Sequence, residues 1–71
     1  MDRTFLERQL VMVERHIATG QRHVSIQQQL IEMLRRAGAN IEEATKLLGQ
    51  FNELQSLHVA HRDRLRKQLG L

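Results

Sequence analysis

Residues 7–34 divide into four consecutive sevens: ERQLVMV, ERHIATG, QRHVSIQ and QQLIEML. The fourth position of each seven is a branched apolar residue, in order Leu10, Ile17, Val24 and Ile31. The seventh position holds Val13, Gly20, Gln27 and Leu34. An apolar repeat with steps of three and four residues is typical of a helix that packs lengthwise against another helix. The stretch therefore predicts one long helix whose seam is interrupted by a glycine and a glutamine.

A second arm with the same repeat follows residue 40. Its two expected seam columns are Ala44, Phe51, His58, Leu65 and Leu47, Leu54, His61, Gln68. The break between the arms reads RRAGAN at residues 35–40, where Gly38 suits the left-handed position that ends a helix. Asn40, with Glu43 three residues later, suits the start of the next helix, and Thr4 with Glu7 repeats this signature upstream.

These signals predict an all-α fold, an antiparallel two-helix hairpin of the coiled-coil type. The single domain spans 1–71, with one helix over about 5–37, a turn at 38–40 and a second helix over about 41–69. A symmetric turn there pairs Gly20 with His58, Gln27 with Phe51 and Ile17 with His61. In this register, Gly20 leaves room for an imidazole. The alternative is that Gly20 is tolerated without a packing reason.

The composition restricts the class of protein. The 71 residues include no Cys, Pro, Trp or Tyr, and the net charge is +3. Without Cys there is no disulfide, thiolate zinc site or thiol nucleophile, which fits a reducing compartment. Apolar runs are too short for a membrane span. We therefore expect a cytoplasmic protein with no membrane contact.

The apolar residues extend beyond a single seam. A hairpin with one seam cannot cover them all, and the simplest cover is a second copy, which gives an antiparallel four-helix bundle. We expect a homodimer and leave open another protein partner. The expected interface residues are Phe5, Met12, Ile26, Leu30, Met33, Leu48 and Leu57.

Four histidines are the main candidates for chemistry. His58 and His61 stand three residues apart on the expected seam, and His16 lies near their partners, so these three are metal-ligand candidates. However, the Glu-x-x-His and His-Glu-x-x-His motifs are absent, and neither seam column holds a carboxylate. We therefore favour a structural polar layer and expect no metal, no cofactor and no enzyme activity. A catalytic acid pair, a nucleophile beside a histidine and a Gly-rich phosphate loop are also missing from the sequence.

Arginines recur on the outermost column of the first helix, which suggests an alternative function in nucleic-acid binding. The candidate basic residues are Arg8, Arg15, Arg22 and Arg36, with Arg62, Arg64, Arg66 and Lys67 near the C-terminal end. They could hold phosphates, although interspersed acids and the absence of Tyr and Trp also fit an ordinary solvated face.

Two segments resemble small uncharacterised bacterial helical-hairpin proteins, namely ERHIATGQRHV at 14–24 and LHVAHRDRLRKQLG at 57–70. This resemblance implies a bacterial cytoplasmic protein and carries no known activity. In outline, the expected dimer is also similar to the RNA-binding Rop-type plasmid regulators, although no Rop-specific motif is present. Together these observations predict a non-enzymatic homodimeric hairpin that acts as a protein-interaction or scaffolding module. The alternative is a small nucleic-acid-binding regulator.

Overall fold

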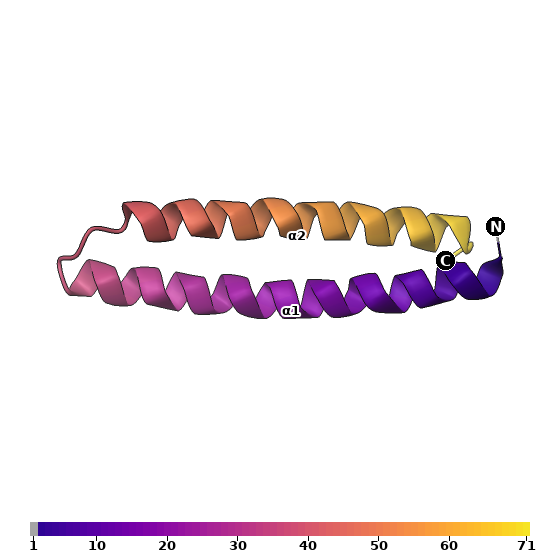
Figure 1. The fold of residues 1–71 in the computed structure, drawn as a ribbon, viewed down its shortest axis with the longest axis horizontal. Coiled ribbons are helices and arrows are strands. Elements are labelled where there is room, and N and C mark those ends of the chain that lie inside the picture. The colour runs from indigo at the N-terminus through magenta and orange to yellow at the C-terminus, as the bar shows by residue number, and fades with distance from the viewer. Residues whose placement is uncertain (1) are drawn as a thin grey trace.

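The computed structural model describes residues 2–71 as two long antiparallel helices joined by one turn (Figure 1). Helix α1 spans Arg3–Arg36 and helix α2 spans Glu42–Gln68. The hairpin measures 53 × 15 × 14 Å, so its length is more than three times its width. The predicted all-α two-helix hairpin is confirmed, and the observed helix bounds lie within two residues of the expected ones. Neither helix has an apolar stretch long enough to serve as a membrane span.

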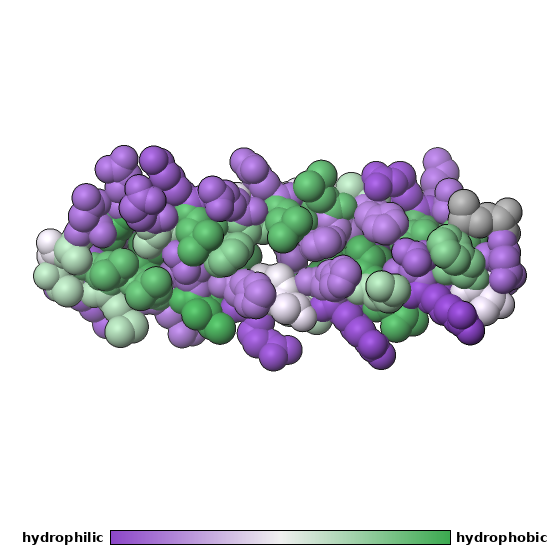
Figure 2. Space-filling model, viewed as in Figure 1, coloured by the Kyte–Doolittle hydropathy of each residue, from purple (hydrophilic) through white to green (hydrophobic). Residues whose placement is uncertain are grey.

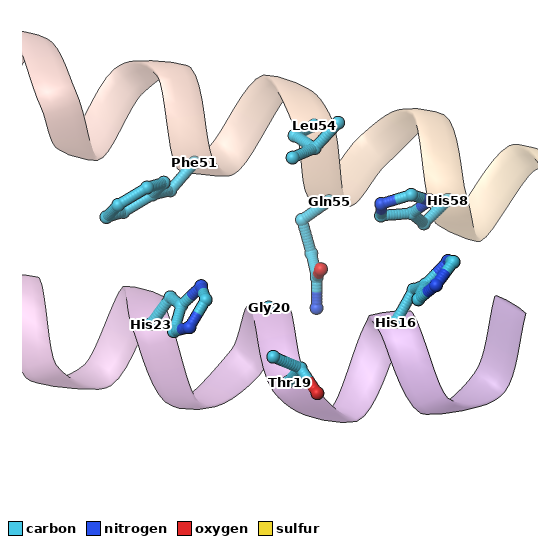
Figure 3. Close-up of a pocket in the computed structure, with 8 residues that line it drawn as sticks. All are labelled: His16, Thr19, Gly20, His23, Phe51, Leu54, Gln55 and His58. Atoms are coloured by element: carbon cyan, nitrogen blue, oxygen red, sulfur yellow. The ribbon is translucent and has the colours of Figure 1, made fainter. Parts of the chain in front are cut away.

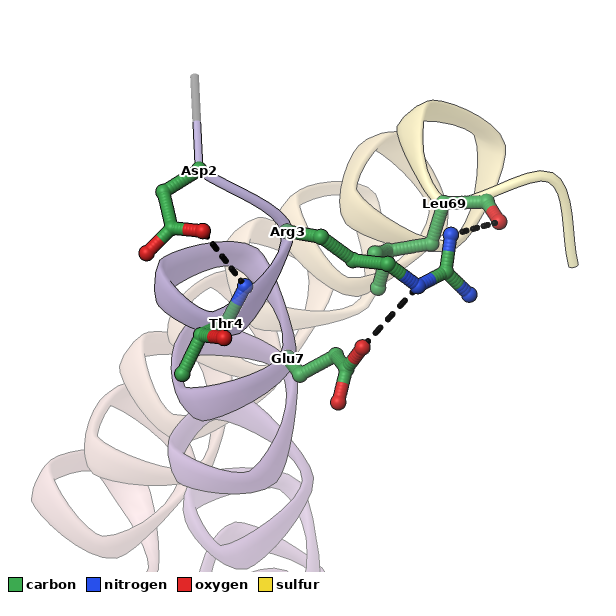
Figure 4. Close-up of polar contacts among 5 residues, drawn as sticks. All are labelled: Asp2, Arg3, Thr4, Glu7 and Leu69. Atoms are coloured by element: carbon green, nitrogen blue, oxygen red, sulfur yellow. Dashed lines mark hydrogen bonds and ion pairs between the residues drawn. The ribbon is translucent and has the colours of Figure 1, made fainter.

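Helix α1 begins two residues earlier than expected, because Asp2 caps it. The Asp2 carboxylate accepts a hydrogen bond from the backbone N–H of Thr4 at 3.3 Å, which satisfies one of the free donors of the first turn. The expected capping box of Thr4 and Glu7 is therefore wrong. Glu7 instead pairs with Arg3 at 3.0 Å, and Arg3 also donates to the Leu69 carbonyl at 3.4 Å (Figure 4). Arg3 thus ties the start of α1 to the end of α2.

The turn between the helices is built as the sequence predicts, around Gly38 and Asn40. Gly38 adopts a φ of +70°, and the N–H of Ala39 donates back to the Leu34 carbonyl at 2.9 Å. This pattern is the Schellman motif, which needs a left-handed residue and so favours glycine. Asn40 then accepts from the N–H of Glu42 at 2.9 Å. The N-cap of α2 is Ile41 and has no side-chain cap, so the expected capping box of Asn40 and Glu43 is wrong.

The seam of α1 is the one that its sequence predicts. Its buried or half-buried positions include both expected columns from end to end: Leu6, Leu10, Val13, Ile17, Gly20, Val24, Gln27, Ile31 and Leu34. Val13 is the least exposed, at 2%. The best-buried cluster lies at the open end of the hairpin, where Leu65 and Leu69 of α2 join Leu6, Leu10 and Val13. Most of the remaining seam is only half-buried.

One of the two expected seam columns of α2 is wrong. The column of Ala44, Phe51, His58 and Leu65 does line the seam, but its companion is one residue later than expected. The companion column is Ile41, Leu48, Gln55, Arg62 and Leu69. Leu47 and Leu54 were expected inside and are instead 39% and 52% exposed. A repeat with steps of three and four residues fits either column as the second half of the seam. The column of Leu47 and Leu54 looks the more apolar in the sequence, but the column of Leu48 and Gln55 is the one that lines the seam.

Two glutamines set the register of the hairpin. Gln55 of α2 donates to the Ile17 carbonyl of α1 at 2.8 Å, and Gln27 of α1 donates to the Ala44 carbonyl of α2 at 2.9 Å. Each helix therefore sends one amide to the backbone of the other. Gln27 is only 6% exposed, so its amide would be costly to leave without a partner.

The expected register is therefore wrong by about one helical turn. Gly20 faces Gln55 and not His58, and Gln27 bonds to the backbone at Ala44 and does not face Phe51. The reason lies in residues 37–41, which are not helical and so cover more length per residue than a helix does. Figure 1 shows α2 starting set back from the end of α1.

The role of Gly20 is to admit the Gln55 side chain. A Cβ built on Gly20 would lie 2.9 Å from Cδ of Gln55 and would collide with its Oε1. Gly20 does make room for a side chain of the other helix, as expected, but this side chain is the amide of Gln55 and not the imidazole of His58. Gly49, by contrast, has no atom within 4 Å of an added Cβ, so no packing reason for a glycine exists there.

Prediction one compares these two glycines. We expect Gly49→Ala to stabilise the protein by about 1 kcal/mol, because alanine has the higher helix propensity and meets no neighbour. Gly20→Ala should give no gain, because displacing Gln55 forfeits a hydrogen bond worth about 1 kcal/mol. Chemical denaturation measures both changes. In a Gln55→Ala background the gain from Gly20→Ala should reappear, and equal gains at both glycines in the parent would contradict this role for Gly20.

Candidate interaction surface

Most of the exposed large apolar residues of the two helices lie on one face of the hairpin, and Val11 is the exception. Two surface grooves establish this, because each is lined from both helices. One joins His16, Thr19 and His23 of α1 to Leu54 of α2, and the other joins Phe5 and Gln9 to His61, Arg64 and Gln68. Residues that lie seven positions before or after these groove-lining residues occupy the same helix columns, and they therefore face the same side of the hairpin. We call this side the apolar face and define it by Phe5, Met12, Ile26, Leu30, Met33, Leu47, Leu54 and Leu57.

Every residue of the apolar face is substantially exposed, from 39% at Leu47 to 67% at Met33 and Leu57. The space-filling view shows hydrophobic side chains reaching the surface along the length of the hairpin, interleaved with hydrophilic ones (Figure 2). Isolated exposed leucines are ordinary, but a row of this length along two helices marks an interaction site. The structure thus carries a surface suited to contact with another molecule.

Charged residues are scarce on the apolar face. Among the helix columns that form it, only Glu43 and Arg64 are charged, and they stand at opposite ends of α2. The columns on the reverse side are mainly polar, and on α1 they carry Glu7, Glu14, Glu32 and Arg35 beside the exposed Val11. A surface that is depleted of charge on one side only is typical of the centre of a protein interface.

The middle of the apolar face is hollowed into a groove of about 250 Å³ (Figure 3). Gln55 crosses its floor above Gly20. On one side of this crossing the rings of His16 and His58 lie 5.2 Å apart, and on the other side the ring of His23 lies 5.7 Å from that of Phe51. The groove is thus an apolar hollow with imidazoles at both ends.

The floor of this groove contains one unpaired polar atom. Oε1 of Gln55 is buried and has no hydrogen-bond partner among residues 2–71, while Nε2 of the same amide bonds to Ile17. A buried acceptor without a partner costs roughly 1–3 kcal/mol. Gln55 thus keeps one acceptor without a partner beneath the groove, next to Gly20.

The three metal-ligand candidates do not form one cluster in the hairpin. His58 lies beside His16, but His61 lines the separate groove near the chain ends. Within residues 2–71, no group of three or more His, Asp or Glu side chains is placed to hold a metal ion. His58 and His61, which the sequence spacing suggested as a pair, thus line two different grooves.

The basic candidates occupy several sides of the molecule. Arg8, Arg15 and Arg22 are exposed along the outer edge of α1, whereas Arg36 pairs with Glu32 at 3.1 Å. Arg62 lies in the seam column and pairs with Asp63 at 3.0 Å. Arg64, Arg66 and Lys67 are exposed on three different columns of α2. The only continuous basic row among residues 2–71 is thus the outer edge of α1.

Six of the seven expected interface residues lie on the apolar face. The seventh, Leu48, is half-buried in the seam and is a correction to that expectation. The face also contains Leu47 and Leu54, which the expected register had placed inside. No pattern within α2 distinguishes these leucines from Leu48. The signal that could have done so is Gly20 of α1, because it makes room for Gln55, which shares a helix column with Leu48.

No protein-family model matches the chain, and no curated protein or solved structure is significantly similar to it. The resemblance to small bacterial hairpin proteins therefore extends no further than the two-helix hairpin itself.

Proposed function

We propose that this chain is a non-enzymatic, homodimeric scaffold, in which two hairpins pack through their apolar faces into a four-helix bundle. The observation that carries the proposal is the concentration of exposed apolar residues and the scarcity of charge on one side of the hairpin. A side of 53 Å by 15 Å offers about 800 Å², which is what each partner buries in a stable interface of standard size.

A second copy suits this face because Phe5 and Met33, and likewise Met12 and Ile26, lie at equal distances on either side of Thr19 in α1. Thr19 and Leu54 line the same groove, so they mark one level near the centre of the hairpin. A twofold axis across the face at that level would set α1 antiparallel to α1 of the second copy, with the turns at opposite ends. On α1 it would pair Phe5 with Met33, Gln9 with Leu30 and Met12 with Ile26. Thr19 and Leu54 would each meet their own copy near the axis.

The two charges of the face favour the same arrangement. Glu43 stands eleven residues before Leu54 and Arg64 stands ten residues after it, so the axis would bring unlike charges together at both ends of the bundle. With the turns at the same end, Glu43 would instead lie over the apolar stretch of Leu30 and Met33. Unlike charges that meet across an interface fix its orientation.

The dimer would leave the polar sides and the arginine edges of both copies outside. These are the surfaces on which a scaffold could hold other proteins, acidic ones in particular. The apolar face itself would be occupied by the second copy.

Prediction two tests the dimer with a matched pair of substitutions. Val11 and Met12 are neighbours in α1 and are 49% and 50% exposed, but only Met12 belongs to the apolar face. Light scattering should give about twice the 8.3 kDa chain mass for the parent and for Val11→Glu. Met12→Glu should weaken the dimer by about a hundredfold, because a carboxylate would be buried without a partner. A parent that is monomeric at micromolar concentration, or equal effects of both variants, would contradict the proposal.

The alternative function, binding of nucleic acid, rests on the basic row of Arg8, Arg15 and Arg22. These side chains recur every seven residues, about 10 Å apart along α1, and could follow a phosphate backbone.

Prediction three decides whether this row binds nucleic acid. If it does, retardation of structured RNA or duplex DNA should weaken steeply with salt. Changing Arg15 and Arg22 to Gln should then reduce binding while the helical circular dichroism signal is kept. Absence of retardation at low salt would exclude this alternative and would leave the scaffold proposal unaffected.

A further inference from the structure

His16 and His58 acquire a third imidazole beside them only when the proposed dimer forms, so a site that uses this imidazole rests on the proposed function. In one hairpin, His16 and His58 lie side by side, and His23 stands across the Gln55 crossing from them (Figure 3). His16 is three residues before Thr19 and His23 is four residues after it. A twofold axis at the level of Thr19 therefore brings His23 of the second copy opposite His16 and His58. The dimer would contain two such clusters.

We propose that each cluster of His16 and His58 with His23 of the second copy binds a divalent transition-metal ion, with zinc as the representative. Neutral imidazole is a good ligand for zinc, copper and nickel. Three protein ligands with water in the fourth position form a common open zinc site. One hairpin supplies no cluster of three ligands among residues 2–71, so the site is incomplete without the second copy.

The separation of the His16 and His58 rings fits a shared ion. Two imidazoles bound to one tetrahedral zinc ion, with Zn–N bonds of about 2.0–2.1 Å, have ring centroids about 5 Å apart. The observed separation is 5.2 Å. The ring separation is therefore compatible with coordination of one ion by both imidazoles. His23 is exposed, so its side chain is free to turn from Phe51 toward the second copy.

Gln55 lines the same groove as His16, His23 and His58 and carries an acceptor of the kind that such a site uses. A metal-bound imidazole usually donates its other ring N–H to a carbonyl or carboxylate oxygen, which holds the ring in place. Oε1 of Gln55 is a buried acceptor in the same groove without a partner among residues 2–71.

The experiment uses the full chain and zinc alone as the probe. Isothermal titration near neutral pH should give about one zinc ion per chain, in keeping with two equivalent sites in a twofold dimer. His23→Ala, and separately His16→Ala with His58→Ala, should each weaken binding by more than about tenfold. His61→Ala is the matched control, because His61 lines the other groove, and it should leave the affinity unchanged. Circular dichroism establishes that each variant is folded.

A mixture of the two variants shows whether the site spans two copies. The His23→Ala chain keeps His16 and His58, and the doubly substituted chain keeps His23, so only their heterodimer rebuilds one complete site. After unfolding and refolding together in equal amounts, random pairing should restore tight binding to about one quarter of a site per chain. Tight binding by neither the mixture nor the parent would overturn the inference. Binding that survives His23→Ala would also overturn it, because the site would then lie within one copy.

Light scattering in EDTA separates this inference from the proposed function. A dimer in EDTA that binds no zinc would overturn the metal site and leave the scaffold standing. A monomer both with EDTA and with zinc would overturn both.

Discussion

The hydrogen bond from the Gln55 amide to the Ile17 carbonyl, made across Gly20, is the interaction on which the rest of the hairpin depends. If the seam were apolar throughout, one helix could shift along the other by a turn, because the apolar repeat would present similar residues after the shift. The Gln55 bond and its counterpart from Gln27 to Ala44 are directional and part-buried, so another register would break both of them. The register is therefore set by polar groups within an apolar seam.

This register decides which residues are left outside. With Gln55 in the seam, Leu54 turns outward to the same side as Met12 and Ile26, and the hairpin acquires one apolar side and one polar side. The same choice places His58 next to His16 in the central groove. Surface and groove are thus both consequences of a glycine and a glutamine that meet across the seam.

The sequence was sufficient for the helices and the turn, because Gly38, Asn40 and the α1 repeat are local signals with one physical meaning each. It was insufficient for the seam of α2, where Leu47 and Leu48 compete for one place and hydrophobicity cannot choose between them. The expected seam columns also omit Gln55, a polar residue that the seam accommodates because Gly20 lies opposite it. The exposed apolar residues of α1 (Phe5, Met12, Ile26, Leu30 and Met33) could be found from the sequence, because the exposed columns of α1 do not depend on the register.

The register can be tested most directly by nuclear Overhauser effects in the labelled full chain. We expect contacts between the Hα protons of Gly20 and the side-chain amide of Gln55, which should exchange slowly with solvent because it is bonded to Ile17. Mixed labelled and unlabelled chains distinguish contacts within one hairpin from contacts between copies. Contacts from Gly20 to the His58 ring within one hairpin, with Gln55 in fast exchange, would contradict the glutamine-set register and restore the symmetric one.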